Sequence, residues 1–226
     1  MINVLEDLYK YKSILCLDGD LPCDLIKKIN LPIIAADGAA NTLIPNGLEP
    51  MMIIGDLDSV DPSLLSNRAH WRVECQDSTD FEKSLNFIKA KSLDPTIVMG
   101  ISGGCIDHTL GNISIFSETE FIAISGNIIF MPLNGSRNFN VPIGTKISIF
   151  GMPSCTIRSK GLKWELNGQI SLSGKNSISN RAATAIVELE ILSGRAMIFI
   201  YRRSNRKNSP ASPQSRGMLF EEQWRF

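Results

Sequence analysis

Short, uninterrupted apolar runs recur through the first half of the chain, separated by longer mixed stretches. They lie at residues 13–17, 32–36, 51–54, 96–99 and 121–124. Strands that are buried on both faces of a parallel sheet show this continuous apolarity, whereas half-exposed strands alternate between apolar and polar residues. The pattern therefore predicts an α/β fold with a parallel sheet that is covered on both faces.

Two of the mixed stretches carry helix signals. Thr79 can cap a helix, and Glu82, three residues later, completes a capping box. The apolar stripe of this helix consists of Phe81, Leu85 and Ile88. A second helix is expected to start at Asp107, because apolar or small residues recur around it at helical spacing. They are Ile106, Leu110, Ile113 and Ser117.

The pattern changes near residue 131. Residues 138–203 alternate with a period of two, as in 187–191, and glycine and Asn-Gly turns interrupt them. This texture predicts an antiparallel β domain. We therefore expect a first domain at 1–131 and a second at 132–203. Residues 204–226 are polar and rich in Arg, Ser and Pro, and are predicted to be a disordered tail.

Composition excludes several classes of protein. Lys plus Arg and Asp plus Glu both number 23, so the chain has no overall charge with which to bind nucleic acid non-specifically. No apolar run approaches the roughly 20 residues that span a bilayer, and residues 1–20 lack the architecture of a signal peptide. The five cysteines are scattered without a CxxC pair, which argues against disulfides or zinc. A cytoplasmic protein is expected.

Acidic residues follow the predicted strands, where a parallel sheet places its chemistry. They are Asp37, Asp56, Asp58, Asp80 and Asp107. Each of them alone can be a cap or turn residue. Asp56 and Asp58, however, follow one strand and repel each other unless a cation lies between them. Carboxylate oxygens suit Mg²⁺, which also binds phosphate oxygens. The sequence therefore predicts a magnesium site.

A phosphate-binding segment is the second candidate feature. Gly103 and Gly104 precede a predicted helix, so their backbone N–H groups and the helix dipole can bind phosphate; the alternative is a plain turn. Lys83 would share a helix face with Asp80, either as its salt-bridge partner or as a phosphate contact. No GxxxxGK[ST] motif is present, which excludes a P-loop. An acidic pocket that holds a polyphosphate therefore requires a divalent metal.

Six motifs occur in order along the chain: ADGAAN at 36–41, IGDLDS at 54–59, DSTDFEK at 77–83, GGCIDHT at 103–109, GLKW at 161–164 and SN at 179–180. Across residues 13–201 this series resembles the thiamine pyrophosphokinase family. The resemblance implies transfer of the pyrophosphoryl group of ATP to thiamine, giving thiamine diphosphate and AMP. It also implies a nucleotide-binding α/β domain, a C-terminal β-sandwich, and a homodimer whose thiamine pocket lies between the two subunits.

The resemblance assigns roles to individual residues. Mg²⁺ would be held by Asp56, Asp58 and Asp80. Catalysis would involve Asp107, Asp80 and Asp58. ATP would be bound by Asp37, Gly38, Lys83, Gly103, Gly104 and His108. Thiamine would contact Trp164, Ser179 and Asn180. Trp164 can offer an aromatic face to the thiazolium cation. The structural alternatives are a core or interface role for Trp164, turn formation by Ser179 and Asn180, and a helix-end role for His108.

Two positions depart from the family pattern. Cys105 stands where the family commonly has an arginine after the glycine pair, so a cationic phosphate contact is missing. Residues 18–20 read Asp-Gly-Asp where relatives usually have Asn-Gly. These departures keep two alternatives open. One is a different magnesium-dependent phosphotransferase or nucleotide hydrolase. The other is a non-catalytic thiamine or nucleotide sensor, which Cys105 favours.

Overall fold

The computed structural model describes residues 10–202, so the predicted tail at 204–226 lies outside the described residues. Within them, strands pair in parallel in the order β4-β3-β2-β1-β5-β6. Their bounds are β1 Ser13–Cys16, β2 Ile33–Ala36, β3 Met52–Gly55, β4 His70–Arg72, β5 Thr96–Met99 and β6 Ile122–Ser125. The five predicted apolar runs are all strands, and the parallel sheet is confirmed.

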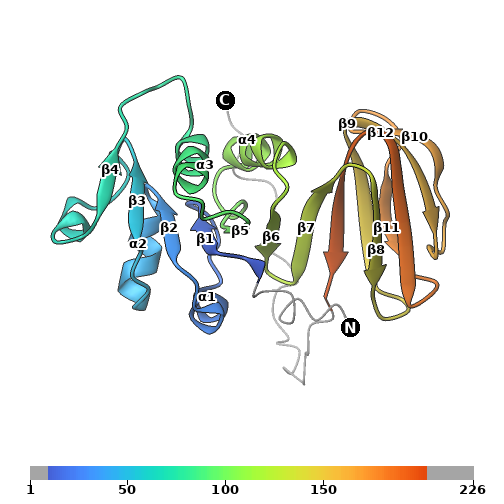
Figure 1. Cartoon of the computed structure of the whole chain (residues 1–226), viewed down its shortest axis with the longest axis horizontal. Helices are drawn as coiled ribbons and strands as arrows, with labels where there is room; N and C mark the ends of the chain where they lie inside the picture. Colours follow the sequence, from blue (N-terminus) through green and yellow to red (C-terminus); the bar gives the residue numbers. More distant parts are fainter. Residues whose placement is uncertain (1–9, 203–226) are drawn as a thin grey trace, which may run out of the picture.

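Helices cover both faces of this sheet (Figure 1). Alternate residues of each strand point to opposite faces, so Ile14 packs with the α1 and α2 side and Leu15 with the α3 and α4 side. The helices are α1 Cys23–Ile29, α2 Ala39–Leu43, α3 Asp80–Ala90 and α4 Ile106–Ser117. Two 3₁₀ turns, η2 Ile44–Asn46 and η3 Pro62–Leu65, flank β3.

Both predicted helices are present, but their apolar stripes are buried to different extents. Thr79 and Glu82 form the predicted capping box at the start of α3, where Phe81 and Ile88 are buried and Leu85 is half-buried. The spacing also predicted helix α4 correctly. Its apolar stripe, however, is only partly covered, since Ile106 is 80% and Leu110 64% exposed.

Antiparallel strands continue the sheet beyond β6. β7 (Ile128–Leu133) pairs with β6 on one side and with β12 on the other. The remaining strands are β8 Ser136–Asn140, β9 Lys146–Lys160, β10 Asn167–Ser171, β11 Ser177–Arg181 and β12 Ile186–Tyr201. The antiparallel second half is thus confirmed. The predicted boundary at 131/132 falls inside β7, and the division into two domains stays a prediction.

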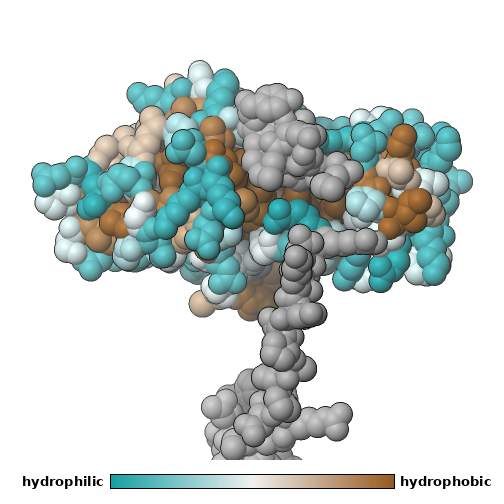
Figure 2. Space-filling view, turned by 90° about the horizontal axis from the view of Figure 1, so that it is seen from below, coloured by the Kyte–Doolittle hydropathy of each residue, from teal (hydrophilic) through white to brown (hydrophobic). Residues whose placement is uncertain are grey.

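The long strands β9 and β12 bend as they pass through the antiparallel part. The first half of β12 pairs with β8, and its second half pairs with β7. Register shifts against β9 mark the bend, as is common where strands turn from one layer into another. This end of the molecule exposes several apolar side chains, including Ile143, Trp164 and Ile178. Brown atoms are visible on it in Figure 2.

The strand order reverses between β1 and β5. From β1 the chain adds β2, β3 and β4 on one side, and then returns to add β5 and β6 on the other. In open α/β sheets, ligands bind outside the carboxyl ends of the strands at such a switch point. Among residues 10–202 no helix is long and apolar enough to cross a bilayer.

Candidate active site

A cavity of about 430 Å³ opens at this switch point. Its walls come from the segments that follow β1, β2, β3 and β5, from the first turn of α3 and from α4. Of the predicted site residues, the lining includes Asp37, Gly38, Asp80, Gly104, Asp107 and His108. Segments that are distant in the sequence thus meet where the strand order predicts a ligand site.

Three carboxylates meet beside this cavity. Oxygen atoms of Asp37, Asp56 and Asp58 lie within 4.8 Å of one another. Asp37 follows β2, and the other two follow the neighbouring parallel strand β3, so the carboxyl ends of adjacent strands bring them together. The structure therefore pairs Asp56 with Asp58 and adds Asp37. Asp80, the third predicted ligand, is not part of this group.

Asp37 is the buried member of the group, with 2% of its surface exposed. Its carboxylate accepts hydrogen bonds from the backbone N–H of Val60 (3.2 Å) and, more weakly, of Ser59 (3.4 Å). Burial raises the pKa of Asp37 to about 6, with the charges of Asp80 and Asp56 adding to the effect and the Ser59 and Val60 bonds opposing it. A carboxylate this costly to ionise is one that a bound cation would stabilise.

The loop that carries Asp56 and Asp58 is held from two sides. The amide of Gln76 donates to Asp56 Oδ2 at 3.2 Å, and this bond contributes most to lowering the pKa of Asp56. On the other side, Asn41 donates to the carbonyl of Ser59 and accepts from the N–H of Asp61, both at 2.8 Å. The loop therefore presents its carboxylates in a fixed arrangement.

Asp80 and Lys83 form an ion pair on α3, with Lys83 Nζ 2.9 Å from Asp80 Oδ1. Burial alone would lower the pKa of Lys83, but the hydrogen bond and charge of Asp80, helped by Asp56 and Cys75, outweigh it and raise that pKa. The structure thus places Lys83 as the salt-bridge partner of Asp80. Both residues, with Asp56, line a second cavity of about 310 Å³.

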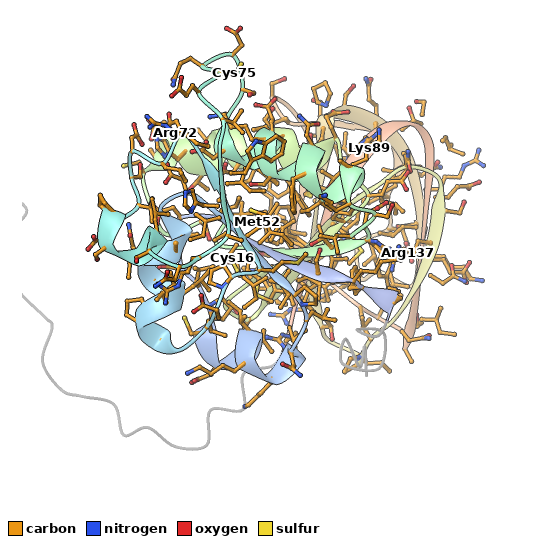
Figure 3. All side chains as sticks on the ribbon, turned by 60° about the vertical axis from the view of Figure 1, so that its left-hand side comes forward. Cys16, Met52, Arg72, Cys75, Lys89 and Arg137 are labelled. Carbon is orange, nitrogen blue, oxygen red and sulfur yellow. The ribbon has the colours of Figure 1, made fainter. Side chains whose placement is uncertain are left out.

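The second cavity lies under the loop between β4 and α3. Figure 3 shows Cys75 in this loop, standing away from the sheet that contains Met52. Asp80 lines both cavities, whereas Asp37 lines only the larger one and Asp56 only the smaller. Asp80 therefore lies between the two, close enough to Asp37 for its charge to raise the pKa of that residue.

The glycine pair and the start of α4 form another wall of the larger cavity. Gly103 has φ +109°, and a Cβ there would lie 2.2 Å from the Asp20 carboxyl carbon, so the position requires glycine. Gly104 and Cys105 line the cavity; the structure places Gly103 behind them, outside the lining. Asp107 lies in the first turn of α4 and accepts the backbone N–H of His108 at 3.0 Å.

Asp18 is an acidic wall residue that the family pattern does not predict. It follows β1, lines the larger cavity, and lies against Gly38, where a Cβ would come 2.5 Å from its Oδ2. A side chain at position 38 would displace this carboxylate. The added negative charge therefore faces the cavity.

The predicted thiamine residues lie in the antiparallel part. Trp164 is 55% exposed, and Lys163 Nζ lies 4.7 Å from its ring centroid. Asn180 is buried, and its side chain bonds the backbone N–H (3.2 Å) and carbonyl (2.7 Å) of Trp164. Ser179 has φ +61° beside it. None of the three lines the larger cavity, whose described walls come only from residues 17–115.

Sequence reasoning missed the residues that support the carboxylates. Asn41 lies inside the ADGAAN motif, so its position one helical turn after Asp37 was a usable signal. Gln76 gave no signal, because nothing in the polar stretch 74–78 indicates that it folds back over β3. The three-carboxylate group offers only hard oxygen donors from a partly exposed pocket, which fits Mg²⁺.

Comparisons with known proteins relate this chain to thiamine pyrophosphokinases. The thiamin pyrophosphokinase catalytic domain matches residues 24–125. Thiamine pyrophosphokinase 2 of Arabidopsis thaliana is 25% identical over 195 residues, which cover 70% of this chain and 73% of the relative. Thiamine pyrophosphokinase 3 of Oryza sativa subsp. japonica is 30% identical over 155 residues, 58% of each chain.

The crystal structure of yeast thiamin pyrophosphokinase matches with a TM-score of 0.75 at 18% identity, covering 87% of this chain and 89% of that one. The fold is therefore the mixed α/β fold of the solved thiamin pyrophosphokinases. Residues 24–125 thus match the thiamin pyrophosphokinase catalytic domain, and the chain is similar in sequence and fold to thiamine pyrophosphokinases.

Proposed function

We propose that this chain transfers the β,γ-pyrophosphoryl group of ATP to the hydroxyethyl oxygen of thiamine, giving thiamine diphosphate and AMP. One observation carries the proposal in the chain itself: the oxygens of Asp37, Asp56 and Asp58 converge within 4.8 Å beside a cavity at the switch point. A polyphosphate can enter such an acidic site only with a divalent cation, and pyrophosphoryl transfer depends mainly on positioning and charge neutralisation.

Asp56 and Asp58 would hold Mg²⁺, with Asp37 as the buried third carboxylate of the group. We retain Asp80 as a proposed ligand because it lines both cavities that flank the group. Bound there, the ion would supply positive charge to the phosphate oxygens. Lys83 orients Asp80 through their 2.9 Å ion pair, and would contribute to phosphate binding only indirectly.

The remaining walls would orient the nucleotide. Gly104 leaves the backbone open to the phosphate chain, and the start of α4, where Cys105 makes no side-chain capping bond, would present the positive end of a helix dipole to it. Asp107 would orient the thiamine hydroxyl or accept its proton, with His108 as the weaker candidate base. Asp37 and Gly38, at the end of β2, would border the nucleotide.

Thiamine would bind between two copies of the chain. Trp164 is exposed and belongs to none of the described cavity walls, so a site that combines it with Asp107 needs a partner's antiparallel part. We therefore propose a homodimer in which Trp164 of one subunit stacks on the thiazolium. Asn180 would act by holding the backbone of Trp164, with Ser179 beside it.

Product identity tests the proposal. Pure protein incubated with thiamine and Mg-ATP should form AMP only when thiamine is present. ADP or free phosphate as the product would instead identify another phosphotransferase or a hydrolase. Binding of both ligands without turnover would identify a sensor, the alternative that Cys105 favours.

A further inference from the structure

Helix α4 provides much of the cavity wall, but its buried side chains lie only at its C-terminal end. The lining residues that it and its cap contribute are Cys105, Asp107, His108, Thr109, Gly111, Asn112 and Ile115. Within α4 only Phe116 and Ser117 are buried, both at its C-terminal end. The first turns, with Ile106 and Leu110 exposed, have little apolar packing to fix them. The position of the wall therefore depends on how the far end of the helix is held.

Two of the contacts at that far end come from β7 and β12. The ring of Phe116 meets Phe130 of β7 edge-on, with centroids 5.3 Å apart. The second contact is polar and comes from β12, 78 residues further along the chain: Arg195 Nη1 donates to the carbonyl of Ser117 at 2.7 Å. The same nitrogen reaches the carbonyl of Thr119 at 3.3 Å.

The guanidinium of Arg195 suits the end of a helix. The carbonyl of Ser117 ends α4 and has no N–H partner further along the helix, and a cation is favoured at the negative end of the helix dipole. Glu118 adds a further charge, with its Oε2 3.9 Å from Arg195 Nη2. The side chain is largely shielded from solvent, with 24% of its surface exposed. Figure 1 shows α4 on the side of the sheet that adjoins β7.

A β-bulge in β9 lies opposite Arg195. The pairing of β12 with β9 shifts between Gly194 and Ala196: only Arg195 lies between them on β12, whereas residues 152–154 lie between their partners on β9. Gly194 has φ +73°, and a Cβ there would lie 2.2 Å from the carbonyl oxygen of Ser154. Bulges of this kind re-aim a side chain and increase local twist. Gly194 thus allows the close approach of β9, and Arg195 follows it on β12 opposite the bulge.

We propose that Arg195 is a positioning residue for the reaction: from the antiparallel part it fixes α4, and through α4 the cavity wall that contains Asp107. The inference rests on the proposed function only in taking the cavity as the site of pyrophosphoryl transfer. A helix moves nearly as a rigid rod, so loosening its C-terminal end displaces its N-terminal end as well. A displacement of about 1 Å at a reacting group can cost up to about a hundredfold in rate.

The test compares Arg195→Gln and Arg195→Lys with Arg158→Gln. Arg158 is a matched control, because it is an exposed arginine in the same sheet whose nearest acid, Glu190, is 4.0 Å away. Amide hydrogen exchange over residues 109–115 should be about three- to tenfold faster in Arg195→Gln and unchanged in Arg158→Gln. Arg195→Lys keeps the charge, so its exchange rate over residues 109–115 should lie between those of Arg195→Gln and the unaltered chain.

Kinetics supply the functional readout. Arg195→Gln should lower kcat about ten- to hundredfold while the KM for thiamine stays within about twofold, and Lys should restore part of the loss. Normal exchange over 109–115 in Arg195→Gln, or normal kcat despite faster exchange, would overturn the proposal. If Arg195→Gln does not fold, the Lys variant decides by the same two criteria. Exchange needs no turnover, so failure of the proposed activity would show separately, as an inactive unaltered chain.

Discussion

A Cβ placed on Gly55 would stand 2.7 Å from the Cβ of Asp37. Real side chains do not approach so closely, so β2 and β3 can deliver their carboxylates to one point only because residue 55 has no side chain. The same glycine directly precedes Asp56. The geometry of the proposed metal site is therefore set by a residue that carries no chemistry itself.

Gly55→Ala should separate the carboxylates. We expect a loss of about 1–3 kcal/mol in the free energy of unfolding, as for overpacked cores, because the nearest atoms belong to the buried Asp37. The stabilisation that Mg²⁺ gives should be lost as well. Urea unfolding with and without Mg²⁺ measures both effects.

Gly174→Ala is the matched control for this substitution. Its added Cβ meets only the hydroxyl of Ser171, which can rotate away. It should retain the Mg²⁺ response. A Gly55→Ala protein that is as stable and as responsive to Mg²⁺ as this control would refute the close-approach argument.

The raised pKa of Asp37 predicts a specific pH dependence of the free energy of unfolding in metal-free protein. Its pKa is about 6 in the folded chain and about 3.9 when unfolded. As pH rises from about 4 to about 6, the unfolded chain loses this proton first, so the native state binds more protons and stability falls. The loss attributable to Asp37 should total about 2–3 kcal/mol and be complete above about pH 6.

Asp37→Asn lacks this titration. Unfolding free energies measured in EDTA between pH 4 and 7 should therefore decline less steeply in the variant than in the unaltered chain. Parallel curves for the two proteins would show that Asp37 ionises normally. Asparagine keeps one of the two acceptor oxygens, so one of the bonds from Ser59 and Val60 is lost. This loss shifts the variant's whole curve, and only the slopes are compared.

Removing a proposed magnesium ligand should separate folding from activity. Asp58→Asn and Asp80→Asn should abolish product formation and leave the fold intact, because both groups are at least partly exposed. Mg²⁺ should raise the unfolding temperature of the unaltered chain but not that of Asp58→Asn. Asp24→Asn, on the opposite face of the sheet, is the control and should respond normally. Near-native activity in either ligand variant would remove that residue from the metal site.

The proposed stacking of Trp164 on thiamine predicts an effect confined to the KM for thiamine. Trp164→Ala should raise the KM for thiamine about 2- to 30-fold, the value of one cation–π contact, with little change for ATP. Trp71→Ala is the control, because Trp71 is also half-exposed but packs on Phe87, with ring centroids 6.0 Å apart. Equal effects on both substrates would contradict stacking.

Lys163 adds a second expectation at the same position. Its ammonium lies 4.7 Å from the Trp164 ring centroid, so a thiazolium that stacks there meets a like charge. Lys163→Gln should therefore lower the KM for thiamine. Stopped-flow or steady-state titration at low salt shows the change most clearly, because salt screens the repulsion. A raised KM would instead give Lys163 a supporting role.

The fold was largely predictable because its central strands are buried on both faces. Residues 96–99 needed no further signal than four consecutive core residues, and the Thr79 capping box located α3 within one residue. β4 could not be foreseen: His70–Arg72 is a short, exposed edge strand with no apolar pattern. The exposure of Ile106 and Leu110 could not be foreseen either, since helical spacing does not say whether a partner surface exists.

The site was less predictable than the fold. Strand ends identified Asp37, Asp56 and Asp58 as candidates, because parallel strands place their carboxyl ends at one edge. The sequence could not show which of the carboxylates group together. Asp37 joins Asp56 and Asp58 through its burial and backbone bonds, and Asp80 is held by Lys83. The support that Asn180 gives to Trp164 depends on pairing between distant strands, which no local pattern encodes.

Labelled ATP tests the central claim most directly. With thiamine, Mg²⁺ and ATP carrying labelled phosphorus at the γ position, the label should appear as the terminal phosphate of thiamine diphosphate, mole for mole with AMP, and Asp58→Asn should give neither product. Label released as inorganic phosphate, or AMP formed without labelled thiamine diphosphate, would contradict transfer of an intact pyrophosphoryl group at this site.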